Sequence, residues 1–328
     1  MKKTIIVTGG AGYIGSTLCR ELLNRGYKVK IIDSLIYGDA AIKDLLKHPD
    51  VELFIKDIRN INGIKKIINS ASALIHLAAI VGDKLCEKNQ KAAVSVNFEA
   101  TKNIVNNCSK IRGLKFIFAS TSSNYGVMDN TKIADENFPL NPVSLYAETK
   151  VDCEQYILDL KSYEFCPVIL RFASAFGISG RTRFDLSVNS FTFEALRDKK
   201  IIVFAANTWR PYIHVYDMSR AIIALLEAPE KKVKKEVFNV GENAMNYQKI
   251  EIARMIKKRL PQIEIDFIEK RDDRSYKLSF DKIRAKVGFR VTKSVDDGII
   301  ELIDAIKSGA ISEKYFFENS LDCLKEIN

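Results

Sequence analysis

Thr8-Gly9-Gly10-Ala11-Gly12-Tyr13-Ile14-Gly15 is a glycine-rich run near the start of the chain, and it gives the clearest indication of the architecture. It follows residues 3–7, an apolar and β-branched run that is typical of a buried parallel strand. The residues after it, 16–23, have helical spacing. Glycines at this junction allow a sharp turn, and the N–H groups at a helix start bind a pyrophosphate. The run therefore predicts a dinucleotide-binding turn.

The length and the composition indicate a folded globular protein. The 328 residues are enough for one large α/β domain, or for a domain with a smaller lobe. The six cysteines are scattered and form no C-x-x-C, so we expect reduced thiols and no metal site. A strand begins at once and no apolar run reaches membrane-spanning length. We therefore expect a cytoplasmic protein that has no signal peptide and does not bind a membrane.

The chain is basic, with a formal net charge of +10. A basic balance can indicate a nucleic-acid partner. Here, however, the charge is spread, and the densest run, at 231–235, is typical of a solvated loop. No interleaving of aromatic and basic residues suggests a platform for stacked bases. We expect no nucleic-acid binding, and an anionic nucleotide substrate fits the charge.

Strands and helices alternate through the first half of the chain. Strands are expected at 28–33, 51–56, 73–77, 114–119 and 166–171. This alternation predicts an α/β fold with a doubly wound parallel (Rossmann) sheet. The sheet domain is expected to comprise residues 1–177 plus 217–240. Residues 178–216 plus 241–328 are expected to form a smaller α+β lobe that binds the substrate.

Asp33 ends the second expected strand, 18 residues after Gly15. A Rossmann unit places at this distance the acid that binds the ribose 2′-hydroxyl of the dinucleotide. An acid there repels a 2′-phosphate, and residues 34–36 supply no arginine. The predicted cofactor is therefore NAD rather than NADP. The alternative is that Asp33 caps the next helix.

The ends of two later strands also point to a ligand site. Ala78 and Ala79 are small, so they let a flat ring or a pyrophosphate come close. His76 precedes them, and we expect it to be a packed strand residue rather than a base. The strand at 114–119 is followed by the hydroxyl cluster 120–123. Because open α/β sheets bind ligands at the carboxyl ends of their strands, this cluster is expected beside the cofactor.

Tyr146 and Lys150 are one helical turn apart, so their side chains point from one face. A tyrosine with a pKa near ~10 is a poor base at neutral pH. An ammonium and an oxidised nicotinamide beside it both favour the phenolate. Half-ionisation near neutrality requires the pKa to fall by about 3 units, or roughly 4 kcal/mol. We expect this pair to act as the catalytic base and its cationic partner.

Together these features resemble the extended short-chain dehydrogenase/reductase family, in its nucleotide-sugar epimerase/dehydratase branch. The resemblance covers nearly the whole chain and is carried by the glycine-rich run, Asp33, Asp57-Ile58, the run 76–79, Asn97, Thr121, Tyr146, Lys150, Arg171 and the run 210–217. It implies that Asp57 and Ile58 hold the adenine and that Asn97 lies near the active site. It implies that Thr121 hydrogen-bonds the reacting sugar hydroxyl, while Tyr146 takes its proton and hydride passes from C4 to the nicotinamide. It also implies that Arg210 and Arg274 bind the diphosphate, for which arginine is well suited.

The candidate site residues fall into three groups. The catalytic candidates are Thr121, Tyr146 and Lys150. The cofactor-binding candidates are Gly9, Gly12, Tyr13, Ile14, Gly15, Asp33, Asp57, Ile58, Leu77, Ala78, Ala79, Asn97, Tyr146 and Lys150. The substrate-binding candidates are Ser122, Ser123, Ser174, Arg181, Asn189, Arg210 and Arg274.

Two departures from the family pattern narrow the expected chemistry. In the 4,6-dehydratases of the family an Asp-Glu pair follows the catalytic threonine, whereas this chain has Ser122-Ser123. Because a serine hydroxyl is a poor general acid or base near neutral pH, we expect no dehydration. Many relatives also carry an asparagine where this chain has Ser174. Serine cannot supply both an amide donor and a carbonyl, so contacts to the substrate are expected to differ there.

The reaction that remains is NAD-dependent oxidation at C4 of a nucleotide-diphosphate hexose or heptose. If the 4-keto sugar leaves, the protein is a 4-dehydrogenase; if it is re-reduced from its other face, the protein is a 4-epimerase. The runs 173–186, 209–214 and 273–276 resemble a sub-branch of capsule and other surface-polysaccharide pathways. That sub-branch includes GDP-heptose 4-dehydrogenases as well as epimerases, and we favour the 4-dehydrogenase.

A third alternative is a non-catalytic NAD-binding sensor, against which the complete set of catalytic candidates argues. Relatives commonly dimerise through the helices that contain Asn97 and Tyr146. We therefore also expect a homodimer.

Overall fold

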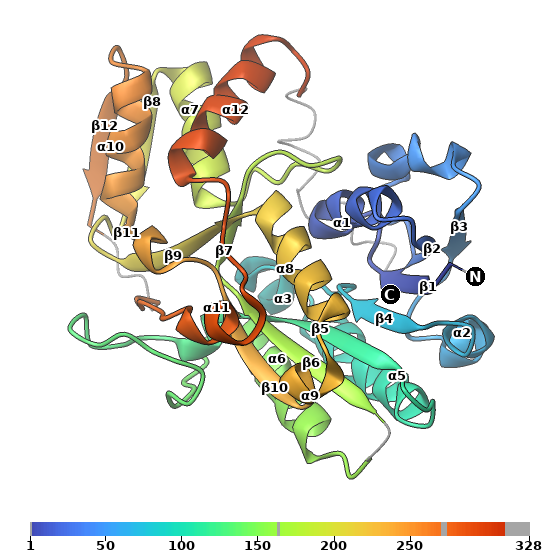
Figure 1. Cartoon of the computed structure of the whole chain (residues 1–328). Coiled ribbons are helices and arrows are strands. Elements are labelled where there is room, and N and C mark those ends of the chain that lie inside the picture. The colour runs from blue at the N-terminus through green and yellow to red at the C-terminus, as the bar shows by residue number, and fades with distance from the viewer. Residues whose placement is uncertain (1, 163–164, 270–273, 312–328) are drawn as a thin grey trace.

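The computed structural model describes residues 2–162, 165–269 and 274–311 of the chain. Among these residues a seven-stranded parallel sheet has the order β10-β6-β5-β4-β1-β2-β3 (Figure 1). Its strands are β1 (Thr4–Thr8), β2 (Lys28–Asp33), β3 (Val51–Ile55), β4 (Ala73–His76), β5 (Lys115–Thr121), β6 (Cys166–Phe172) and β10 (Glu236–Val240). From β1 the chain order runs outward in both directions, so the predicted doubly wound sheet is confirmed.

The sheet is buried on both faces because side chains alternate along each strand. Ile5 and Val7 of β1 belong to the hydrophobic cluster that includes residues of α1 (Tyr13–Asn24) and α8 (Val215–Glu227). Ile6 points the other way, into the cluster that includes residues of α2, α5 and α6. These helices span Ile61–Ile68 (α2), Ala100–Cys108 (α5) and Leu145–Asp159 (α6). The result is a three-layer domain (Figure 1).

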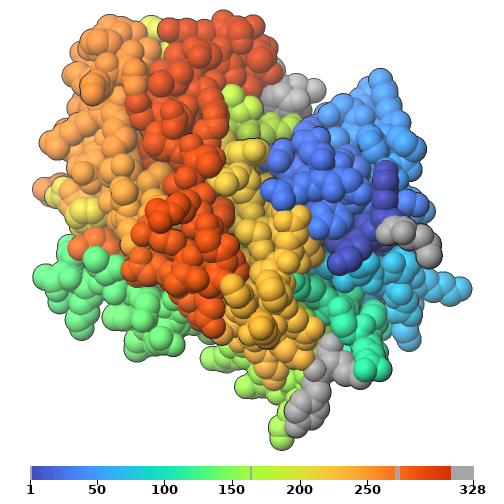
Figure 2. Space-filling model, in the orientation of Figure 1, coloured from blue at the N-terminus to red at the C-terminus, as the bar shows by residue number. Residues whose placement is uncertain are grey.

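Two smaller sheets lie outside this domain. One has the order β11-β9-β7, and the other pairs β12 with β8 in parallel. Their strands are β7 (Ser174–Phe176), β8 (Lys200–Phe204), β9 (Trp209–His214), β11 (Asn246–Gln248) and β12 (Glu264–Ile268), and a third hydrophobic cluster joins them to α7 (Ser187–Asp198), α10 (Lys249–Arg259) and α12 (Val295–Lys307). Figure 2 shows the orange and red segments of this lobe on one side, the blue segments on the other and the yellow segments between them.

The remaining elements are short. They are α3 (Asp83–Lys88), α4 (Gln90–Val94), α9 (Glu230–Val233), α11 (Asp281–Val287), the 3-10 turns Ala40–Ile42, Leu45–Lys47, Ser122–Tyr125 and Asn243–Met245, and a π-helical turn at Ser95–Glu99. Within the described part of the chain, none of the helices has both the length and the apolar character to cross a bilayer. The two-part domain division and the homodimer stay predictions, and the last 17 positions of the expected lobe, 312–328, lie outside the described residues.

His76 is a packed strand residue, as expected. Its Nδ1 lies 2.7 Å from Thr8 Oγ1 and its Nε2 lies 2.8 Å from Thr101 Oγ1. The ring is buried and stacks on Phe118. Burial lowers the pKa of His76 to about 3, and the charge of Lys150 acts in the same direction. The folded protein therefore holds this imidazole neutral.

This burial predicts a loss of stability in acid. Between its ordinary pKa near 6.5 and about 3, His76 binds a proton in the unfolded chain but not in the folded one. Its contribution to stability is complete above pH 6.5 and declines as the pH falls. We expect the free energy of unfolding of the wild type to drop by about 2 kcal/mol more than that of His76→Gln between pH 7 and pH 5, as measured by urea denaturation. The exposed His48 supplies the control variant, His48→Gln, and equal pH dependence in His76→Gln and the wild type would contradict the assignment.

Candidate active site

The glycine-rich turn connects β1 to α1 at the point where β4 also ends. Gly9 has a φ of +71°, and a Cβ there would lie 2.7 Å from the backbone nitrogen of Ala78. A Cβ on Gly15 would lie 2.2 Å from the carbonyl oxygen of Gly9. Gly12 is the N-cap of α1 and makes no side-chain cap, so N–H groups at this helix start are available to a ligand. This cradle fits a dinucleotide pyrophosphate.

Asp33 lies beside this turn. One carboxylate oxygen accepts a hydrogen bond from Ala11 N at 3.0 Å and the other accepts one from Leu35 N at 2.9 Å. Burial raises the pKa of Asp33, and these backbone donors oppose that rise. The carboxylate therefore binds the cradle and the start of the next loop rather than a helix N-terminus. Each of its oxygens keeps a further lone pair that a ribose hydroxyl can use.

The other cofactor-binding candidates also follow strand ends. Ile58 is buried after β3, and the carboxylate of Asp57 accepts hydrogen bonds from the backbone and the guanidinium of Arg59. Burial acts to raise the pKa of Asp57, but the Arg59 hydrogen bonds hold it below its usual value. Ala78 N donates to Thr8 Oγ1 at 3.3 Å, which ties the segment after β4, with Leu77 and Ala79, to the glycine turn. The adenine contact of Asp57 and Ile58 stays a prediction.

Asn97 acts on the backbone beyond β4. Its Oδ1 accepts a hydrogen bond from Ile80 N at 2.8 Å, and its Nδ2 donates to Ile80 O at 2.9 Å. Asn97 lies in the π-helical turn Ser95–Glu99, an irregularity of the kind that often re-aims a side chain at a functional site. Through Ile80 it fixes the loop over which the nicotinamide is expected.

Thr121, Tyr146 and Lys150 come together at the carboxyl end of β5. Thr121 is the last residue of this strand, and its Oγ1 accepts a hydrogen bond from Ser123 N at 3.1 Å. Tyr146 lies in the first turn of α6; burial raises the pKa of its phenol, and the nearby Thr121 side chain acts to lower it. Lys150 is buried one turn later and donates to Ala119 O at 2.8 Å, with its Nζ 6.0 Å from the centre of the Tyr146 ring. This geometry suits a proton transfer at Tyr146.

The electrostatics of this group differ from the sequence-based expectation. Burial raises the pKa of Tyr146 above its usual value, and the charge of Arg183 opposes that rise most strongly. Burial lowers the pKa of Lys150 to about 8. The chain alone therefore keeps the phenol protonated at neutral pH, because the loss of solvent outweighs the nearby cations. Positive charge on a bound ligand therefore has to lower the pKa of Tyr146 further before the phenolate can form.

Arg183 was not among the candidate residues. Its guanidinium is bound by the carboxylate of Asp185, with contacts of 3.0 and 2.5 Å. Although burial acts to lower it, the pKa of Arg183 is held above its usual range by Asp185, and Tyr146 adds to this effect. The signal in the sequence was the polar loop that contains both Arg181 and Arg183. Sequence alone does not tell which of the two arginines reaches the phenol.

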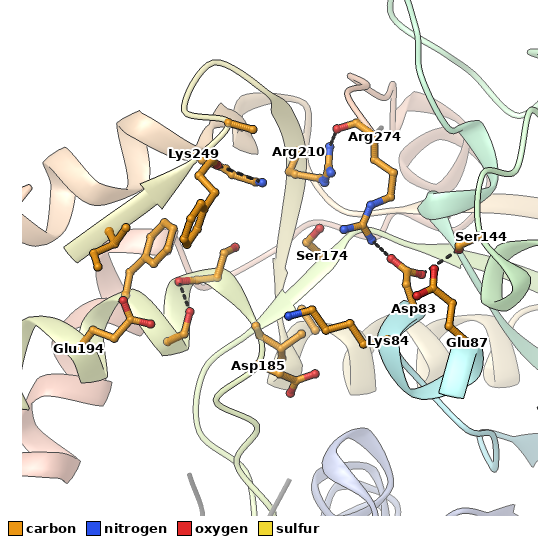
Figure 3. Close-up of a pocket in the computed structure, with 18 of the residues that line it drawn as sticks. Asp83, Lys84, Glu87, Ser144, Ser174, Asp185, Glu194, Arg210, Lys249 and Arg274 are labelled. Atoms are coloured by element: carbon orange, nitrogen blue, oxygen red, sulfur yellow. Dashed lines mark hydrogen bonds and ion pairs between the residues drawn. The ribbon is translucent and has the colours of Figure 1, made fainter. Parts of the chain in front are cut away.

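The substrate-binding candidates divide into two places. Ser174, Arg210 and Arg274 line one cavity of about 940 Å³ between the sheet domain and the smaller lobe (Figure 3). Arg274 pairs with Asp83 at 2.5 Å, and Arg210 donates to the carbonyl oxygens of Trp209 and Arg274. Lys84 and Lys249 also lie in the wall, together with acidic residues such as Glu87 and Glu194, so the lining has both charges and its two arginines are the groups suited to a diphosphate (Figure 3).

Ser122 and Ser123 lie beside Thr121. Ser122 is buried, with its Oγ 3.1 Å from the hydroxyl of Tyr276. Asn189 is buried on α7 and uses its amide on Gly177 and on the carbonyl of Arg183, so it shapes the loop between β7 and α7. Arg181 stacks on Tyr37 near Asp33 instead of lining the cavity. Substrate contacts by all of these residues stay predictions.

Comparisons with known proteins agree with this geometry. The model of the NAD dependent epimerase/dehydratase family matches residues 5–241. A putative UDP-glucose 4-epimerase of Methanocaldococcus jannaschii is 28% identical over 313 residues, which cover 93% of this chain and 98% of that protein. The UDP-glucose 4-epimerase of Bacillus subtilis is 28% identical over 279 residues, or 77% of this chain and 81% of that protein. A solved UDP-glucuronic acid 4-epimerase of Bacillus cereus, in complex with UDP-glucuronic acid and NAD, is 28% identical with a TM-score of 0.82, and covers 93% of this chain and 99% of its own.

The position of Asp33 predicts a strong preference for NADH over NADPH. Removing its charge in Asp33→Asn is expected to weaken NADH binding by about 10- to 150-fold, because a buried hydrogen bond to a charged group is worth about 1.5–3 kcal/mol. The same change is expected to narrow the gap between NADH and NADPH. Fluorescence titration with both nucleotides measures this, with Asp39→Asn at an exposed position nearby as the control. Equal affinity of the wild type for the two nucleotides would remove Asp33 from this role.

Proposed function

The chain belongs to the NAD-dependent epimerase/dehydratase family, and we propose that it inverts C4 of a nucleotide-diphosphate sugar by oxidation and re-reduction. The observation that carries this proposal is the cluster of Thr121, Tyr146 and Lys150 at the carboxyl end of β5, where Lys150 Nζ lies 6.0 Å from the centre of the Tyr146 ring. The glycine cradle at the end of β1 and the cavity that holds Arg210 and Arg274 support it. NAD, when bound, supplies the acceptor for the hydride of C4.

The residues of the chain handle the proton. Thr121 binds the C4 hydroxyl and orients it toward Tyr146, whose phenolate accepts the hydroxyl proton as C4 becomes a ketone. Because burial raises the pKa of Tyr146, the phenolate forms only when positive charge is concentrated around it. Lys150 and Arg183 are the cations that the chain supplies. In the return step Tyr146 gives the proton back to the oxygen at C4.

Elimination of water is not part of the proposal. Ser122 and Ser123 stand where the dehydratases of the family carry an acid pair, and a serine hydroxyl is a poor general acid near neutral pH. The 4-keto sugar can either be released or be reduced again at C4. The sequence favoured release of the 4-keto sugar, which makes the protein a 4-dehydrogenase. The relatives named as 4-epimerases support its re-reduction at C4. The 4-dehydrogenase is the second candidate, favoured by the resemblance of the runs 173–186 and 209–214 to the sub-branch that includes GDP-heptose 4-dehydrogenases.

Arg183 favours an acidic sugar. Its charge acts on the pKa of Tyr146, and its guanidinium binds Asp185, which lines the cavity, so we place it near the sugar. A carboxylate at C6 is close to C4 in a hexuronic acid, and the terminal nitrogen of Arg183 that does not bind Asp185 can donate a charge-assisted hydrogen bond to it. The B. cereus relative was solved with such a sugar nucleotide. We therefore include nucleotide-diphosphate hexuronic acids among the proposed substrates.

A panel of UDP-, GDP-, CDP- and dTDP-sugars tests the proposal, with the mass and the C4 configuration of each product as readouts. Inversion at C4 with no change of mass is the expected result. Loss of two hydrogens with formation of NADH would show the 4-dehydrogenase, and loss of water would contradict the role given to Ser122 and Ser123. No conversion of any sugar would favour a non-catalytic NAD-binding protein.

Tyr146→Phe is expected to lower turnover of the active sugar by about 10²- to 10⁴-fold, which is the usual worth of a positioned general base. The melting temperature and the affinity for NADH should remain near those of the wild type. Tyr156 lies on the same helix and its hydroxyl donates to Asn106 at 2.6 Å, so Tyr156→Phe is the matched control. Turnover by Tyr146→Phe at the wild-type rate would exclude Tyr146 as the base.

Arg183→Gln is expected to change the choice of sugar. If Arg183 binds a sugar carboxylate, kcat/KM for UDP-glucuronic acid should fall about 10- to 150-fold more than kcat/KM for UDP-glucose. The effect of Arg183 on the Tyr146 pKa is the same for both sugars, so it cancels in the ratio of the two kcat/KM values. Arg254→Gln, at an exposed position of α10, is the control. An unchanged ratio would show that Arg183 does not select the sugar by its charge.

A further inference from the structure

Two loops from different parts of the chain meet beside Asp33. One, residues 34–39, follows β2, and the other, residues 177–186, connects β7 to α7. The guanidinium carbon of Arg181 lies 3.4 Å from the centre of the Tyr37 ring, so the two side chains stack face to face. One residue earlier the backbones are also in contact, because a Cβ on Gly180 would lie 2.4 Å from Ala41 O.

Hydrogen bonds hold the backbone of both loops near the contact between Tyr37 and Arg181. The hydroxyl of Tyr13, the first residue of α1, donates to Gly177 O at 2.8 Å. Arg181 sits in a tight turn in which its own N–H donates to Ser179 Oγ at 3.1 Å. On the opposite side Arg20 of α1 donates to Ala41 O at 2.9 Å. The stacked pair is therefore held between two anchored backbones.

The position of the pair relates it to the cofactor. Asp33, which we assign to the adenosine ribose, is close enough to Arg181 for the arginine charge to oppose the rise that burial causes in the Asp33 pKa. Gly177, the first residue of the loop that carries Arg181, is bonded to Tyr13 at the start of α1, where the pyrophosphate is expected. A dinucleotide in this cleft thus has the stacked pair at its adenosine end.

The Tyr37 ring is not part of the hydrophobic core. It is 40% exposed, so its packing contributes little to the stability of the domain. Arg181 likewise takes no part in the lining of the substrate cavity. The contact between the two side chains bridges the two loops.

We propose that Tyr37 and Arg181 form a clamp across the adenosine end of the NAD site, which must open before the dinucleotide enters or leaves. The clamp slows exchange of the cofactor without contacting the reacting atoms. Its consequence rests on the proposed function: an enzyme that returns the hydride to C4 regenerates NAD in place and gains from slow exchange. A 4-dehydrogenase has to release NADH after each turnover, and the clamp would limit its rate.

The test measures cofactor exchange with no sugar present. The protein loaded with NADH is mixed in a stopped-flow instrument with excess NAD, and the loss of NADH fluorescence gives the dissociation rate constant. We expect Tyr37→Ala to raise this rate constant about 2- to 30-fold, because a cation–π contact is worth about 0.5–2 kcal/mol. Arg181→Ala should give a similar rise, and the double variant should add little to either single variant.

Two further measurements keep the proposal falsifiable. Tyr37→Phe retains the ring and should release NADH more slowly than Tyr37→Ala. The control Arg25→Ala, which breaks an exposed ion pair with Glu227 at the C-terminal end of α1, should release NADH at the wild-type rate. The association rate constant of NADH should rise in Tyr37→Ala together with the dissociation rate constant, because the clamp is also closed in the absence of the ligand. An unchanged dissociation rate in Tyr37→Ala, or a rise with no change in association, would overturn the clamp. Because no sugar is used, this outcome is independent of whether the proposed epimerisation is found.

Discussion

The close approach of the β1–α1 turn to the segment after β4 is the constraint on which the rest of the site depends. A side chain at Gly9 would collide with the backbone of Ala78, and one at Gly15 would collide with the turn itself. β1 and β4 are neighbours in the sheet, and the chain runs outward from β1 in both directions. The ligand crevice of an open α/β sheet forms at such a switch point. This approach therefore places the glycine turn with only β4 between it and the end of β5, which carries Thr121 of the proposed catalytic group.

A buried ionic network supports the catalytic end of the crevice. Glu154 of α6 and Arg171 of β6 are both buried and pair at 2.6 Å. Glu154 also accepts hydrogen bonds from Ser120 and Asn124, which flank Thr121 and the serines after it. Such a pair is costly to bury, and removal of one partner leaves an uncompensated charge. Because Glu154 belongs to α6 and bonds the residues around Thr121, the network holds the turn after β5 against the helix that carries Tyr146.

The features that the sequence predicted well are those controlled by short-range rules. Strand periodicity and the glycine spacing indicated the doubly wound sheet, and the four-residue spacing of Tyr146 and Lys150 put both side chains on one face of α6. The apolar surroundings of His76 in β4 likewise indicated a packed residue. The predicted cofactor is that of the family to which the chain belongs.

The features that the sequence did not predict depend on loop directions. Arg181 and Arg183 are two positions apart, yet one stacks on Tyr37 and the other acts on Tyr146. The tight turn at Ser179 and the amide of Asn189 set these directions, and neither leaves a periodic pattern in the sequence. The raised pKa of Tyr146 was also missed, because the extent of burial follows from the packing of both lobes.

The fate of a label at C4 tests most directly the claim that this site removes a hydride from the sugar and returns it to the same carbon. A converted sugar nucleotide is prepared with deuterium at C4, and its C4 epimer is analysed by mass spectrometry and NMR after turnover in ordinary water. The account predicts that the epimer keeps the deuterium at C4, because the hydride never exchanges with solvent. An epimer in which C4 carries hydrogen from water would contradict it.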